Sequence, residues 1–171
     1  MTLTIADKYY LKALDEYPWD LEQTMENLNY AFSYDDEHAG ANCLMGKLYM
    51  EQFQQYEVSE QYFIDAMASD PCNLKTCESY VKLMIETNQV QKAKKLISYA
   101  KKLTGCEIGK FLWFEALLFE KVKEYDKAKE KIKEAMLEAF DSENIELMEA
   151  ELDRVNKKLS MYKKVQYKLL D

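Results

Sequence analysis

The chain has 171 residues, of which 48% are apolar and 32% charged, a balance that excludes an intrinsically disordered protein. Its net charge of −8 disfavours nucleic acid as a partner, because an acidic chain repels phosphate. Only four glycines and two prolines occur, so turns are few and an all-α fold is favoured.

Apolar residues recur at helical spacing along the whole chain, and no segment alternates apolar and polar residues for long enough to predict a strand. Pro18, Asp70-Pro71, Asn88 and Thr104-Gly105 interrupt the pattern with residue types that end helices. We therefore predict helices over residues 3–17, 19–34, 39–53, 56–69, 73–87, 89–103, 107–122, 124–139 and 142–169.

The charge is distributed unevenly. Residues 1–70 carry a net charge of −11, residues 71–140 carry +4, and residues 141–171 carry −1. Solvated helix faces of different composition explain this pattern. The alternative is an acidic N-terminal surface that steers a basic partner or discourages self-association.

No segment predicts a signal peptide or a membrane span. The N-terminal residues lack a basic stretch followed by an apolar run, and the most apolar stretch, 111–119, is interrupted by Glu115 and shorter than a bilayer span. The cysteines show no CxxC spacing, so free thiols and a cytoplasmic location are expected. They are Cys43, Cys72, Cys77 and Cys106.

One stripe of four residues occurs in four copies along the chain. Its second place holds a small residue, its third a large apolar residue four positions later, and its fourth an alanine three positions after that. The closing alanines lie 35, 34 and 35 residues apart, and a period in this range is typical of a stacked helical array. The copies are Leu21, Thr24, Leu28, Ala31; Tyr56, Ser59, Phe63, Ala66; Val90, Ala93, Ile97, Ala100; and Tyr125, Ala128, Ile132, Ala135.

The second copy and the helix before it resemble the tetratricopeptide repeat (TPR) consensus, W-x2-L-G-x2-Y followed by A-x3-F, alanine and proline. The matching residues are Asn42, Met45, Gly46, Tyr49, Tyr56, Ser59, Phe63, Ala66 and Pro71. The third copy has Val81 in place of the glycine, and the fourth also lacks it while keeping Leu112, Ala116 and Phe119. The resemblance covers residues 5–140 and is strongest over 39–140.

The resemblance implies an α–α superhelix of about four antiparallel helix pairs, within a single domain over 1–171. The expected pairs are 3–34, 39–69, 73–103 and 107–139. A repeat cannot bury its apolar face alone, so the helix over 142–169 is expected to cap the last pair through its apolar stripe. The alternative is a dimerisation or docking helix, because its end beyond Met161 exceeds what capping requires.

In the TPR family, the first helix of each pair lines a concave groove that receives peptides or extended protein segments. Carrying these groove places over gives three rows: Tyr9, Cys43, Glu78, Trp113; Ala13, Lys47, Lys82, Leu117; and Glu16, Met50, Ile85, Glu120. Aromatic anchors carry much of the binding energy in such grooves. The lysine–asparagine–arginine clamp of chaperone-tail-binding members is not reproduced, so heat-shock chaperone tails are disfavoured. The expected contact residues are Tyr9, Cys43, Lys47, Met50, Glu78, Lys82, Ile85, Trp113 and Leu117.

No catalytic constellation appears in the sequence. There is no P-loop, GxGxxG or HExxH motif, and His38, the sole histidine, is expected in a solvated acidic loop. Neither enzyme activity nor a cofactor or metal is therefore predicted.

These observations favour a non-enzymatic interaction module that binds a protein or peptide partner, without nucleic acid or membrane. The size and acidity also resemble the small secretion chaperones of the TPR superfamily, which hold an apolar segment of an exported protein. The alternative is a structural subunit that forms a homo-oligomer through its C-terminal helix or an exposed apolar face.

Overall fold

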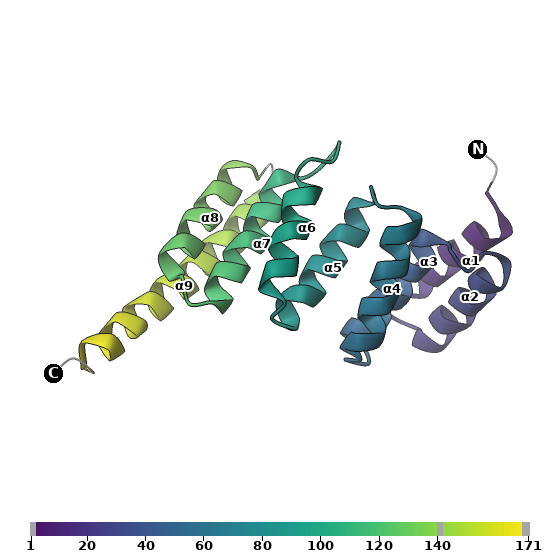
Figure 1. The fold of residues 1–171 in the computed structure, drawn as a ribbon, viewed down its shortest axis with the longest axis horizontal. Coiled ribbons are helices and arrows are strands. Elements are labelled where there is room, and N and C mark those ends of the chain that lie inside the picture. The colour runs from purple at the N-terminus through teal and green to yellow at the C-terminus, as the bar shows by residue number, and fades with distance from the viewer. Residues whose placement is uncertain (1–2, 140–141, 169–171) are drawn as a thin grey trace. The chain divides into compact units, whose positions relative to one another are not determined.

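We describe residues 3–139 and 142–168 of a computed structural model, and the side chains of all of these except 142, 143 and 166–168. All regular structure in these residues is helical, which confirms the all-α prediction (Figure 1). Each bound lies within three residues of its expected position, apart from Leu169, the expected end of the last helix, which lies outside the described residues. The helices are α1 (Ile5–Glu16), α2 (Leu21–Tyr34), α3 (Ala39–Glu51), α4 (Tyr56–Ser69), α5 (Leu74–Glu86), α6 (Val90–Ala100), α7 (Ile108–Lys121), α8 (Tyr125–Leu137) and α9 (Ser142–Lys168).

The chain divides into two compact units. Unit 1 ends at Leu83 and contains α1 to α4 and most of α5. Unit 2 begins at Met84 and contains the end of α5 and α6 to α9. We describe each unit by itself, and the single domain over 1–171 stays a prediction.

Helices α1, α2 and α3 of unit 1 begin at polar residues whose side chains accept hydrogen bonds from free N–H groups of the first turn. Thr4 and Asp7 form a capping box at α1, in which the Thr4 hydroxyl accepts from the Asp7 N–H and the Asp7 carboxylate accepts from the Thr4 N–H. These hydrogen bonds, from the Thr4 backbone first and then from the side chains of Thr4 and His38, lower the pKa of Asp7 to about 2. Asp20 caps α2 in the same way by accepting from the Gln23 N–H.

His38 is not the solvated loop residue that the sequence suggested. Its side chain is 11% exposed, and its Nδ1 accepts a hydrogen bond from the Ala41 N–H at 3.0 Å, which makes it the N-cap of α3. Its Nε2 lies 3.1 Å from the Asp7 carboxylate. The acidic sequence around it suggested solvent, but the ring links the start of α3 to the start of α1.

The turns inside three successive helix–turn–helix segments share one backbone conformation. Gln54, Asn88 and Lys123 all adopt positive φ angles of 53°, 57° and 62°, and they are 34 and 35 residues apart. The N–H group of the residue after each of them bonds back to a carbonyl in the preceding helix, as in common helix C-terminal motifs. The repeat therefore appears in the backbone as well as in the side-chain stripe.

The second, third and fourth residues of the stripe are buried in all four copies. In unit 1, the Phe63 ring of α4 lies against Gly46 of α3, where a Cβ would come within 2.9 Å of the ring. The Ser59 hydroxyl donates to the Gly46 carbonyl at 2.7 Å. Glycine at position 46 therefore lets the Phe63 ring pack directly on the α3 backbone, where a Cβ would press against the ring.

In unit 2, α7 and α8 pack as a pair and α9 packs on α8 (Figure 1). Met148 and Val155 of α9 are buried in one cluster with Ala128 and Ile132 of the α8 stripe and with Leu112 of α7. Farther along α9, the side chains of Met161 and Val165 are 67% and 57% exposed. α9 thus covers the last pair as far as Tyr162, whose ring lies 5.6 Å from that of Tyr125, while Met161 and Val165 are exposed.

Replacing the glycine at the α3–α4 contact tests this packing. We expect Gly46→Ala to lower the free energy of unfolding by up to about 2 kcal/mol, because overpacking costs about 1–3 kcal/mol and the helix propensity of alanine offsets about 1 kcal/mol of it. Urea denaturation followed by circular dichroism measures the change.

The control is the same substitution made in a Phe63→Leu background. There the added methyl group meets a smaller side chain, so Gly46→Ala is expected to cost less than it does beside Phe63. A Gly46→Ala protein more stable than the wild type would contradict the packing described.

Candidate functional site

The predicted groove residues of unit 1 divide into buried and accessible groups. Ala13, Cys43 and Met50 are buried, and burial raises the pKa of the Cys43 thiol. Glu78 is half-buried and Lys82 is exposed. Lys82 and Glu78 of α5 thus remain at the surface. The three buried residues belong to the packed interior of α1 and α3 and are not accessible to a partner.

Two further predicted residues of unit 1 have aromatic partners. The Tyr9 ring stacks on Tyr30 and Tyr34 of α2, with ring centroids 5.1 and 6.0 Å away. The Lys47 ammonium lies 5.2 Å from the centroid of the Tyr17 ring, a cation–π contact. The sequence pattern did not reveal either partner, because both contacts join residues far apart in the chain.

In unit 2, Ile85 is buried, while Trp113 and Leu117 of α7 are half-buried. The Trp113 ring lies 5.4 Å from that of Phe114 and packs on the core cluster of α7, α8 and α9. Its indole N–H is buried and has no acceptor among the described residues. Leaving a buried donor without a hydrogen bond costs about 1–3 kcal/mol of folding free energy, so this N–H group is an energetic cost in the folded protein.

Glu120, the last member of the third row, is engaged by α9. Its carboxylate accepts two hydrogen bonds from the Arg154 guanidinium and one from Lys158 Nζ at 2.7 Å. Burial alone would raise the pKa of Glu120, but the hydrogen bonds from these two cations outweigh it and lower the pKa. Glu120 therefore anchors α9, whereas Glu16, its counterpart on α1, is exposed.

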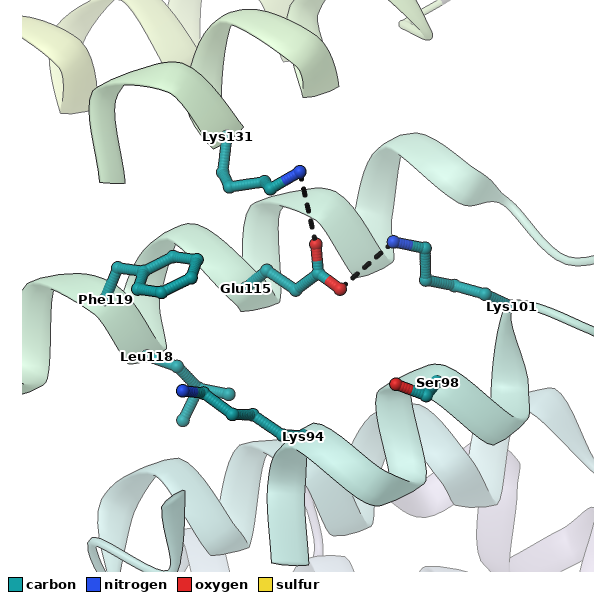
Figure 2. A pocket seen from close by; sticks show the side chains of 7 residues that line it. All are labelled: Lys94, Ser98, Lys101, Glu115, Leu118, Phe119 and Lys131. Carbon is teal, nitrogen blue, oxygen red and sulfur yellow. Dashed lines mark hydrogen bonds and ion pairs between the residues drawn. The ribbon is translucent and has the colours of Figure 1, made fainter. Parts of the chain in front are cut away.

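A pocket of about 370 Å³ lies on unit 2 between α6, α7 and α8 (Figure 2). Figure 2 shows the ammonium groups of Lys101 and Lys131 reaching the Glu115 carboxylate from different helices, at 3.0 and 3.8 Å. The pocket is lined by Lys94, Ser98, Lys101, Glu115, Leu118, Phe119 and Lys131.

The pocket combines positive charge with an aromatic face. The Lys94 and Lys127 ammonium groups lie 5.2 and 5.6 Å from the centroid of the Phe119 ring. Lys127 also pairs with Glu124 at 2.5 Å, and a hydrogen bond to Glu134 raises the pKa of Lys131 despite partial burial. Lysines thus outnumber the single carboxylate that lines the pocket.

Sequence reasoning missed this pocket because it looked for function on the first helix of each pair. Most of the pocket's charge comes from the second helices, where lysines were interpreted as solvated faces. The positive balance of residues 71–140 was the available signal. It could not show that Lys101 and Lys131 meet at Glu115 of α7 or that Lys94 lies over Phe119, because that depends on how the helices pack.

No chemistry beyond binding is indicated by the described side chains. Among them, no group of three or more histidine, cysteine, aspartate or glutamate residues is placed to hold a metal ion. All four cysteines are free thiols, with Cys43 and Cys77 buried. No helix within the described residues is both long and apolar enough to cross a membrane.

Comparison with known proteins supports the fold. The structure is similar to that of PilF from Pseudomonas aeruginosa, with a TM-score of 0.75 and 19% sequence identity over 95% of this chain and 70% of that chain. Neither the models of protein families nor the curated proteins give a match to the sequence. The all-helical architecture and this likeness identify a TPR-like helical repeat fold.

The Glu120 anchor can be tested by removing its charge. We expect Glu120→Gln to lower the free energy of unfolding at pH 7 by about 1 kcal/mol, a modest value because Arg154 is partly exposed, and to speed amide hydrogen exchange in α9. The folded-state pKa of Glu120 is below its ordinary value of 4.5, so the stabilisation is complete above pH 4.5 and is lost as pH falls below it.

Denaturation at pH 7 and pH 3, with hydrogen exchange read by mass spectrometry, measures both effects. Glu149→Gln, an exposed glutamate of the same helix, is the matched control and should change neither. If the difference in free energy of unfolding between wild type and Glu120→Gln is the same at pH 3 as at pH 7, the ion pairs do not hold α9.

Proposed function

We propose that this protein is a non-enzymatic interaction module that binds a segment of a partner protein along the first helices of its pairs. The observation that supports this proposal is that the residues that repeat are buried, whereas the residues that differ between the pairs include accessible ones. The second, third and fourth places of the repeated stripe are buried in every copy, so they set the packing and are not available to a partner. The equivalent groove positions on α3, α5 and α7 carry different side chains, as expected of residues that bind a specific partner.

The accessible members of the expected rows set the chemistry of the proposed site. In unit 1, Lys47 and Lys82 offer positive charge beside Glu78. In unit 2, Trp113 and Leu117 offer half-buried apolar surface. Such a set suits a segment that carries apolar side chains together with carboxylates.

Cys43, Met50 and Ile85 take no direct part in this proposal, because their side chains are buried. They position the neighbouring accessible residues on the same helices. A chaperone-like role, in which the module holds an apolar segment of an exported protein, is one form of the proposed function. The proposed location is cytoplasmic, since the four free cysteines suit a reducing compartment.

A second candidate function is self-association, and one observation favours it. Met161 and Val165 near the end of α9 are exposed apolar residues on a helix that has already covered the last pair. Burial of such residues against a second copy would remove them from water. Light scattering over a concentration series separates the candidates, because a strict monomer at tens of micromolar would exclude self-association.

Charge reversal at the two groove lysines tests the main proposal. We expect Lys47→Glu combined with Lys82→Glu to reduce capture of the partner from native extract by about tenfold or more, since both lysines would face its acidic groups. Quantitative mass spectrometry of the captured proteins gives the measurement, and circular dichroism checks that the helices remain.

The matched control is Lys133→Glu combined with Lys157→Glu, two exposed lysines of α8 and α9 that lie outside the expected rows. It imposes the same change in net charge. Equal loss of capture in both double variants, or no loss in either, would place the binding surface elsewhere.

A further inference from the structure

Unit 2 carries a second pocket that adjoins the one between α6, α7 and α8. It measures about 350 Å³, runs along the outer face of α6, and shares Lys94 and Ser98 with the first pocket. Its lining adds Lys95, Tyr99 and Lys102. Because the two pockets share Lys94 and Ser98, we call them together the α6 trough.

Some cations of the α6 trough lack a carboxylate partner within the described part of the chain. Lys101 and Lys131 share Glu115, so part of their charge is neutralised. Lys94 lies over the Phe119 ring and interacts electrostatically with Glu124, whereas no carboxylate of the described residues pairs with Lys95 or Lys102. The trough therefore has uncompensated positive charge on a chain whose net charge is −8.

The floor of the trough is apolar. Leu118 is almost fully buried beneath it, Phe119 is half-buried, and the Tyr99 side chain is 39% exposed. Half-exposed aromatic residues beside lysines can receive an apolar side chain while the lysines hold the flanking charges. The same floor offers nothing to a ligand that carries charge alone.

We propose that the α6 trough is a docking site for an extended acidic segment of a partner protein. Lys94 lies on α6 and Lys102 lies in the turn two residues beyond its end, and the helical stretch from Lys94 to Ala100 alone spans about 9 Å along the helix axis. Carboxylates four residues apart on an extended segment span about 13 Å, so both lysines can be paired at once. An apolar side chain between those carboxylates then lies against Phe119 or Tyr99.

The arrangement of charges favours a carboxylate-bearing segment over phosphate. The lysines are spread along α6 and the turn that follows it and do not converge on a point, as a site for a compact dianion would require. The net charge of −8 further opposes a polyanionic nucleic acid.

A second copy of this chain is a poorer occupant. Its acidic residues are concentrated in residues 1–70, and most of them lie on helices. The connections between the helices of unit 1 are only four residues long, at 17–20, 35–38, 52–55 and 70–73. None of them supplies an extended acidic segment long enough to reach from Lys94 to Lys102.

The test uses the full chain and a fluorescein-labelled twelve-residue peptide, with glutamates four residues apart and leucine between them, followed by fluorescence anisotropy. We expect Lys94→Glu combined with Lys102→Glu to weaken binding by at least about tenfold. Ser98→Trp, which fills the trough without changing its charge, is expected to weaken binding as well. The same peptide with glutamine in place of glutamate is expected not to bind.

The control variant Lys133→Glu/Lys157→Glu should bind the peptide within about twofold of wild type, since both variants add the same negative charge. The groove variant Lys47→Glu/Lys82→Glu should bind it normally as well, so the trough and the proposed groove can fail independently. Circular dichroism confirms that each variant is folded.

The proposal is overturned by any of four results. These are failure of the wild type to bind the glutamate peptide, equal weakening in the trough and control variants, stronger binding of inorganic phosphate or of a single-stranded oligonucleotide, and salt-sensitive self-association that the trough variant abolishes. The last result would identify a second copy as the occupant.

Discussion

A phenyl ring against a bare glycine backbone sets the distance between α3 and α4, and the rest of unit 1 depends on that distance. Phe63 can be fully buried there only because Gly46 has no side chain, and the Ser59 hydroxyl satisfies the Gly46 carbonyl from the facing helix. Burying such a ring contributes about 1.5–3 kcal/mol. In unit 2 the α7–α8 pair lacks this glycine, and Ala116 and Ala128 allow the close approach in its place.

This constraint determines where recognition can occur. Residues that keep two helices in contact must repeat from pair to pair, so they are buried and alike. Residues on the remaining faces are free to differ, and they include Lys82 on α5, Trp113 on α7 and Lys94 on α6. The groove proposal and the α6 trough both use such faces, on the first and second helices of the pairs respectively. The buried stripe supports both surfaces and contacts neither partner.

The helices and the buried stripe could be predicted from the sequence because period and helix-ending residues are local signals. Asn88 and Gly105 were expected to end helices, and both have positive φ. The contact of His38 with Asp7 and the hydrogen bonds of Glu120 with Arg154 could not be predicted, because each joins residues from distant parts of the chain. The α6 trough could not be predicted for the same reason, since the number of charged residues does not show which lysines contact Glu115.

The most direct test of this account is the free energy of unfolding of Ala128→Leu, in the pair without the glycine. Ala128 is fully buried where α7 and α8 meet, so leucine should cost about 1–3 kcal/mol by overpacking. The same substitution at the exposed Ala150 of α9 should leave stability within about 0.5 kcal/mol of wild type. Equal stability of the two variants would contradict the claim that close approach within each pair holds the fold.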